Sequence, residues 1–233
     1  MADLQHFDEV WGELIGRNGK AEEWRVCIHV AYSQPSRSYH TQRHIATLTT
    51  LAYKHMHLID FATLPVVLLL AIAFHDIVYD PLRSDNEIQS VVQFDSFLDD
   101  MTTAQPLPPA TFNISPPDAA LVRQIILSTI SHTVAVATAD PRHILMCGFF
   151  LDLDLSILAT PEWDAYVEYA GQIRSEYLCY DNAVFTEGRI GVLQKFLGRD
   201  VLYFTPQLKE MWEETARANI WREIEELKGG KNE

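Results

Sequence analysis

The apolar run LPVVLLLAIAF, residues 64–74, constrains the fold of this chain more than any other feature. It is about half as long as the ~20 residues that a helix needs to cross a bilayer, so it predicts a buried helix of a globular protein. Pro65 stands where the first turn of that helix is expected, a position that tolerates proline. The run ends in His75 and Asp76, and core positions rarely take ionisable groups unless something offsets their desolvation. We expect a bound metal ion to do so.

Apolar residues at helical spacing continue along the rest of the chain, and no segment shows the alternation of a half-buried strand. No fixed-period repeat is present. The sequence therefore predicts an all-α fold, a helical bundle that forms a single domain over residues 1–233. The expected helices cover residues 4–17, 21–32, 39–55, 64–74, 85–101, 119–133, 138–159, 161–180, 181–199 and 206–231.

Residues 103–118 contain five prolines and predict a surface loop, in the only stretch that resembles a domain boundary. After this loop, the helix over residues 119–133 should end near His132. The next helix has Pro141 in its first turn, and Asp140 is expected to cap it.

The charge balance limits the class of partner. The chain has 18 Lys and Arg against 32 Asp and Glu, a net charge of −14, so its surface repels nucleic-acid polymers. A small phosphorylated molecule remains a suitable partner, because a metal and a few cations can reverse the field inside one cleft. The many aromatic residues of the C-terminal third suit either the core or a homo-oligomer interface.

The three cysteines indicate the compartment. Cys27, Cys147 and Cys179 are far apart and form no CxxC pair, which predicts reduced thiols and neither a disulfide framework nor a thiolate zinc site. The acidic N-terminal segment lacks the layout of a signal peptide. We therefore expect a cytoplasmic protein without membrane contact.

Metal-type ligands occur at four places in the chain. They are His40 and His44 at a spacing of four on one expected helix face, the His75-Asp76 doublet, His132, and the pair Asp152 and Asp154. Imidazole and carboxylate together suit a divalent ion such as Mn, Mg, Fe, Co, Ni or Zn. An open coordination position on that ion would hold the nucleophilic water of a catalytic site.

Helix geometry restricts how these residues can meet. Adjacent helical residues point about 100° apart, so the His75-Asp76 doublet can bind one ion only from a helix end. Asp152 and Asp154 stand two apart and cannot share a helix face. We favour Asp154 as the ligand, with Asp152 as the competitor.

Several segments of the chain resemble the predicted metal-dependent phosphohydrolases of the HD-domain superfamily, whose signature is H…HD…D. The segments are SRSYHTQRHI, AIAFHDIVYDPLRSDNE, FLDLDLSILA, IRSEYLCYD, GRIGVLQKFL and ARANI, and the likeness runs from about residue 5 to 225. The resemblance implies an HD-type helical fold with His44, His75, Asp76 and Asp154 as metal ligands. For His132 it implies a second metal or a phosphate contact.

The resemblance implies hydrolysis of a phosphomonoester or phosphoanhydride on a small, nucleotide-like substrate by a metal-activated water. The chain lacks the HDxGK and GYP sequences of the cyclic-dinucleotide phosphodiesterases and the additions typical of the guanosine-tetraphosphate hydrolases, so neither of those substrates is expected. Two alternatives stay open: a di-iron oxygenase of the HD type, which requires His132 as a ligand, and a non-catalytic metal-containing binding protein.

Five residues near the expected ligands in the sequence are candidates for catalytic or phosphate-binding roles. Asp80, Asn86 and Glu87 are expected to orient or deprotonate the water. Arg43 and Arg83 are expected to clamp phosphate, with a surface ion pair as the equal alternative.

Overall fold

The computed structural model describes residues 4–17, 19–59, 64–103, 112, 114–134 and 141–229. Helices dominate these residues and none of them lies in a β-strand, so the predicted all-α fold is confirmed. The elements are α1 (Leu4–Leu14), α2 (Lys20–Ala31), α3 (Gln42–His55), η1 (Met56–Leu58), α4 (Leu64–Phe74), α5 (Asn86–Thr103), α6 (Pro116–Ser128), α7 (Pro141–Asp154), η2 (Leu155–Ala159), α8 (Trp163–Glu176), α9 (Asn182–Leu197) and α10 (Pro206–Gly229).

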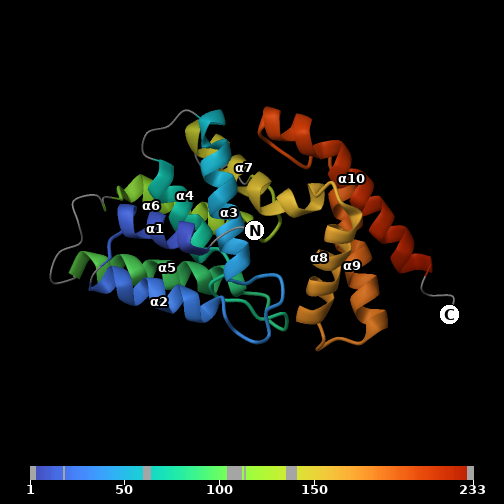
Figure 1. Ribbon diagram of the computed structural model, residues 1–233, viewed down its shortest axis with the longest axis horizontal. Coiled ribbons are helices and arrows are strands. Elements are labelled where there is room, and N and C mark those ends of the chain that lie inside the picture. The colour runs from blue at the N-terminus through green and yellow to red at the C-terminus, as the bar shows by residue number, and fades with distance from the viewer. Residues whose placement is uncertain are drawn as a thin grey trace.

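Helix α4 is the centre of the first group of helices (Figure 1). It contacts α1, α3, α5, α6 and α7, and its residues from Val67 to Phe74 are all buried. A helix that is covered on every side has no polar face, which is why its sequence is apolar throughout. The buried helix predicted for residues 64–74 is confirmed, with the same bounds.

Helices α8, α9 and α10 form a second group with its own apolar core. The chain enters this group from α7 through η2, as Figure 1 shows on its right-hand side. Helix α10 joins the two cores, because Leu208 belongs to the first and Trp212 packs against both. Helix α7 passes directly into η2, whose residues belong to the second core, so the end of α7 lies at the junction of the two groups.

Two helix boundaries differ from the prediction near expected site residues. Helix α3 begins at Gln42, so His40 lies before the helix and does not share a helical face with His44. Helix α6 ends at Ser128, and His132 lies in the following turn with a φ of 47°. Most of the proline-rich loop and the expected cap Asp140 lie outside the described residues.

No single helix in the described ranges combines the length and apolar composition of a membrane span. All three cysteines are free: Cys147 is buried, and Cys27 and Cys179 are exposed.

Candidate metal site

Three elements bring His44, His75 and Asp154 together at the junction of the helix groups. His44 lies in the first turn of α3, His75 directly follows the end of α4, and Asp154 is the last residue of α7. The doublet does lie at a helix end, as its geometry predicted. Each side chain is held by a different helix, so the spacing among them depends on tertiary packing.

The ligand atoms of this trio have the separations of atoms that share one cation. His44 Nε2 lies 3.1 Å from His75 Nε2 and 3.3 Å from Asp154 Oδ1, and His75 Nε2 lies 3.7 Å from the same oxygen. At metal–ligand distances of about 2.1 Å, neighbouring ligands lie about 3.0 Å apart around an octahedral ion and about 3.4 Å apart around a tetrahedral one. The trio could therefore hold a metal ion.

The tautomer of His75 is fixed by the backbone. Its Nδ1 donates a hydrogen bond to the carbonyl of Ile72 at 3.1 Å, so the lone pair of the neutral ring lies on Nε2, which faces the trio. Such a bond from the second nitrogen is the usual support of a metal-bound histidine. Burial lowers the pKa of His44, which favours the neutral form that binds metals.

The electrostatics of the buried site favour positive charge between its carboxylates. Burial alone would lower the pKa of His75, but the nearby Asp76 and Asp154 outweigh it and raise this pKa to about 9. Asp154 is half-buried, and partial burial would raise its pKa, yet hydrogen bonds from His132 and His44 keep this pKa well below the usual value. A divalent cation would supply the same positive charge.

Asp76 and His40 lie next to the trio, and Asp76 contacts the same ring nitrogen of His75. Asp76 Oδ2 lies 3.1 Å from His75 Nε2 and 3.7 Å from His40 Nε2. Asp76 thus contacts His75 but is not part of the cluster of ligand atoms that lie within 4.8 Å of one another, so the predicted fourth ligand does not converge with the trio. His40, which contacts Asp76, is likewise outside this cluster.

Glu176, at the end of α8, fixes the position of His40, and the sequence analysis missed it. Its Oε1 accepts the backbone N–H groups of Ser38, Tyr39 and His40 at 2.8–2.9 Å. Its Oε2 accepts from His40 Nδ1 at 2.7 Å and from the Tyr79 hydroxyl at 2.9 Å. Burial would raise the pKa of Glu176, but these bonds lower it to about 2. They also explain why α3 starts only after His40.

Arg37 is a second missed residue, and it braces the turn after α4. Its guanidinium donates to the carbonyls of Asp76 at 2.7 Å and Ile77 at 3.0 Å, and it is buried between the rings of Tyr32 and Tyr79. Both residues bind backbone groups that lie far away in the sequence: Glu176 binds residues 38–40, and Arg37 binds residues 76 and 77. The local sequences around Arg37 (SRSYH) and Glu176 (IRSEY) do not indicate such distant contacts.

His132 reaches the site from the turn after α6. Its Nε2 donates to Asp154 Oδ2 at 3.0 Å, the oxygen that His44 and His75 leave free. A φ of 47° is costly for a residue with a Cβ, and Arg199 holds this backbone through a hydrogen bond to the His132 carbonyl at 2.8 Å.

Asp152 does not join the ligand cluster. It is fully buried, and its two oxygens accept the backbone N–H groups of Phe204 and Thr205, each at 2.7 Å, just before α10. Burial raises its pKa to about 7 despite these bonds. Residues two apart on a helix face different neighbours. Of the two aspartates, Asp154 is therefore the one that lies beside the other predicted ligands, His44 and His75.

Among the residues expected to act on the water, Glu87 lines the cleft beside the site. Asp80 and Asn86 do not. Their groups stabilise the loop before α5, where Asp80 Oδ1 accepts from Leu82 N and the Asn86 amide pairs with the Asp80 backbone.

The two arginines expected to clamp phosphate are surface ion pairs. Arg43 is 64% exposed and lies 3.9 Å from Glu168. Arg83 donates to both oxygens of Asp85 at 2.8 Å. Their predicted role is not supported, because each side chain is directed to a neighbouring carboxylate outside the cleft.

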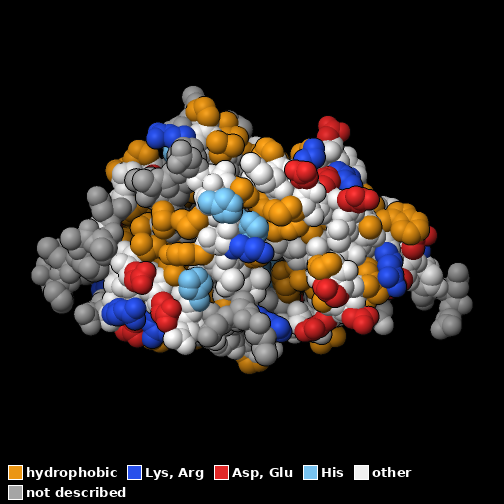
Figure 2. All heavy atoms as spheres, turned by 45° about the horizontal axis from the view of Figure 1, so that its top comes forward, with side chains coloured by type: hydrophobic (Ala, Val, Ile, Leu, Met, Phe, Trp, Pro, Cys, Tyr) orange, Lys and Arg blue, Asp and Glu red, His pale blue; other side chains and the backbone are white. Residues whose placement is uncertain are grey.

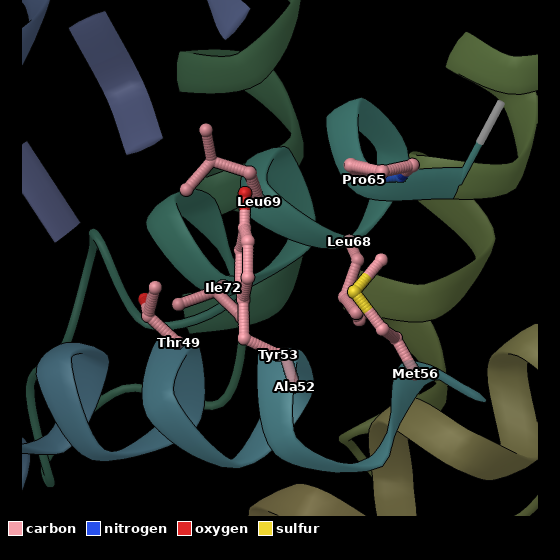
Figure 3. Close-up of a pocket in the computed structure, with 8 residues that line it drawn as sticks. All are labelled: Thr49, Ala52, Tyr53, Met56, Pro65, Leu68, Leu69 and Ile72. Carbon is pink, nitrogen blue, oxygen red and sulfur yellow. The ribbon is translucent and has the colours of Figure 1, made fainter. Parts of the chain in front are cut away.

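A cleft of about 870 Å³ opens from the site and runs along α8 and α9. Asp76, Asp154, His40 and His132 lie at one end. Its volume is in the range of sites that bind small organic molecules. A second hollow, between α3 and α4, has only about 10 Å³, room for about one water molecule. Figure 3 shows that mostly apolar side chains line it, so it carries no comparable chemistry.

Comparisons of this chain with protein-family models, with curated proteins and with solved structures gave no match.

Proposed function

We propose that this protein is a metal-dependent hydrolase of a phosphomonoester or phosphoanhydride on a small organic molecule. One observation carries the proposal: the ligand atoms of His44, His75 and Asp154 lie close together, and Asp154 lines a cleft large enough for such a substrate. The proposal agrees with the resemblance of the sequence to HD-domain phosphohydrolases, which rests on the same residues.

In this proposal His44, His75 and Asp154 hold the ion, and Asp76, which the sequence resemblance implies as a fourth ligand, lies beside His75. A bound divalent ion would lower the pKa of a water toward ~7 and neutralise charge on the phosphoryl oxygens. Two imidazoles beside carboxylates favour Mn, Fe, Co, Ni or Zn over Mg. His132 orients Asp154, and Glu176 orients His40 beside Asp76.

The charges along the cleft support an anionic substrate. Lys195 and Arg199 line it, and Arg199 donates to the backbone carbonyls of Ser131 and His132, which do not neutralise its charge. Basic side chains lie apart from one another on the face in Figure 2 and form no continuous patch, which supports a small partner rather than a nucleic-acid polymer. We also propose a cytoplasmic location, because free thiols are typical of reducing compartments.

The test measures phosphate release from a panel of nucleotides and phosphate esters, with each divalent metal added to metal-free protein. We expect release with at least one metal, and its loss in His44→Ala and Asp76→Ala. His57→Ala is the matched control, because His57 is exposed in η1, just after α3. No metal-dependent release from any panel member would favour the non-catalytic binding protein.

A second candidate is a di-iron oxygenase, which is favoured by the contact between His132 and the second oxygen of Asp154. In this candidate His132 and Asp154 would help to hold the second iron. Metal analysis of protein purified without added metal separates the candidates: two irons per chain favour the oxygenase, and one exchangeable divalent ion favours hydrolysis.

A further inference from the structure

Helix α9 presents an apolar stripe to the cleft instead of to a core. Val184, Gly188 and Val192 are spaced four residues apart, so they lie along one side of the helix, and all three line the cleft. Val184 is 52% exposed and Val192 is 45% exposed. This side of α9 has apolar surface that a ligand in the cleft would remove from water.

Gly188 keeps the middle of this stripe open. A Cβ added there would meet no atom within 4 Å. Glycine weakens a helix by about 0.5–1 kcal/mol relative to alanine, and no close packing of the described residues requires it here. The glycine widens the cleft where the two valines border it.

Three aromatic rings lie beside this stripe in the cleft wall. Tyr177 lies nearly parallel to Tyr180, with ring centroids 6.2 Å apart, and Phe185 lies 6.0 Å from Tyr177. All three rings line the cleft. They provide surfaces that suit the face of a flat ring.

Three polar groups of the same wall, the hydroxyls of Tyr169 and Tyr180 and the guanidinium of Arg189, already have partners. The Tyr169 hydroxyl accepts from Arg189, whose guanidinium pairs with both oxygens of Glu223. The Tyr180 hydroxyl donates to the Pro81 carbonyl at 3.3 Å. The wall therefore suits an apolar group better than a sugar, whose hydroxyls need free hydrogen-bond partners.

We propose that this wall binds a flat, largely apolar ring system, so that the substrate is an aryl-type phosphate ester whose phosphate reaches the metal site. The inference rests on the proposed function for the position of the phosphate. It assigns the α8–α9 wall to the organic part of the molecule and disfavours sugar phosphates and inorganic polyphosphates.

The test compares Gly188→Leu with Gly171→Leu. Both glycines lie in helices with no atom within 4 Å of an added Cβ, but only Gly188 lines the cleft. Calorimetry measures the binding of 1-naphthyl phosphate and glycerol 2-phosphate to metal-loaded protein. We expect the wild type and Gly171→Leu to bind the naphthyl ester about tenfold more tightly or better, and Gly188→Leu to lose that preference. Val192→Asp provides a second, polar variant of the wall, should Gly188→Leu fail to fold.

Phosphate release measured on the same samples separates this inference from the proposed function. Selective binding of the naphthyl ester without hydrolysis would support the wall and count against the hydrolase. Equal affinity for the two esters, binding of neither, or an unchanged preference in both wall variants would overturn the inference, whatever the rate of hydrolysis.

Discussion

At the residue scale, Asp152 and Asp154 of α7 have different roles because the helix directs their side chains to different partners. Asp154 faces two histidine rings across the helix junction, whereas Asp152 holds the backbone before α10. The sequence predicted that only one aspartate of this pair binds the metal. It could not predict the partner of the other, because Phe204 and Thr205 lie more than fifty residues away.

Exchanging each aspartate for asparagine separates the two tasks. Asp152→Asn replaces one acceptor oxygen by an amide that faces a backbone N–H, so we expect a loss of about 1–3 kcal/mol in the free energy of unfolding with metal affinity retained. Asp154→Asn should instead weaken metal binding by about 100-fold or more, because it removes a charged ligand. Urea unfolding and metal titration of both variants measure this. Weakened metal binding in Asp152→Asn, together with retained metal binding in Asp154→Asn, would contradict the structure.

Glu176 should be a structural support of the site. In Glu176→Gln an amide replaces an oxygen that accepts from His40 and Tyr79, and we expect a loss of about 1–3 kcal/mol in stability. Glu168→Gln is the control on the same helix, since its side chain is 63% exposed and should change stability by less than about 0.5 kcal/mol. Denaturant unfolding measures both, and equal effects would argue against this role of Glu176.

At the element scale, apolar spacing predicted the positions of the helices well, because each buries one side or, for α4, all sides. Capping by distant residues is not encoded locally. The start of α3 is the example: the expected helix included Tyr39 and His40, yet Glu176 binds the N–H groups of residues 38–40 and the helix begins only at Gln42. That delay also determines where His40 lies relative to Asp76.

The packing of α7 against the segment before α10 depends on a small residue. A Cβ on Gly148 would lie 2.8 Å from Phe204 Cβ, a close contact between inflexible atoms. We expect Gly148→Ala to lower the free energy of unfolding by about 1–3 kcal/mol. Gly191→Ala, in α9 with open space around the added Cβ, should raise it by about 0.5–1 kcal/mol. Thermal or urea unfolding tests the pair, and a neutral Gly148→Ala would mean that the helix moves aside easily.

At the scale of the whole molecule, the site joins elements that are far apart in the sequence. His44, His75 and Asp154 come from α3, the turn after α4, and α7, beside the junction with the second helix group. A ligand that binds only the folded chain stabilises it through mass action. A metal ion bound at this trio would therefore stabilise the whole folded chain.

Metal addition should raise the stability of the whole protein. A divalent ion at 100 times its Kd should add about 2.7 kcal/mol to the free energy of unfolding, visible as a higher Tm, and chelation should reverse it. Asp154→Asn should show a much smaller shift at the same concentration. An equal rise in both proteins would indicate that the ion binds elsewhere.

The most direct measurement is the anomalous diffraction of crystals grown with Mn²⁺. The account predicts a peak about 2.0–2.3 Å from His44 Nε2, His75 Nε2 and an oxygen of Asp154. A trio without a peak, or manganese bound only at other residues, would contradict it.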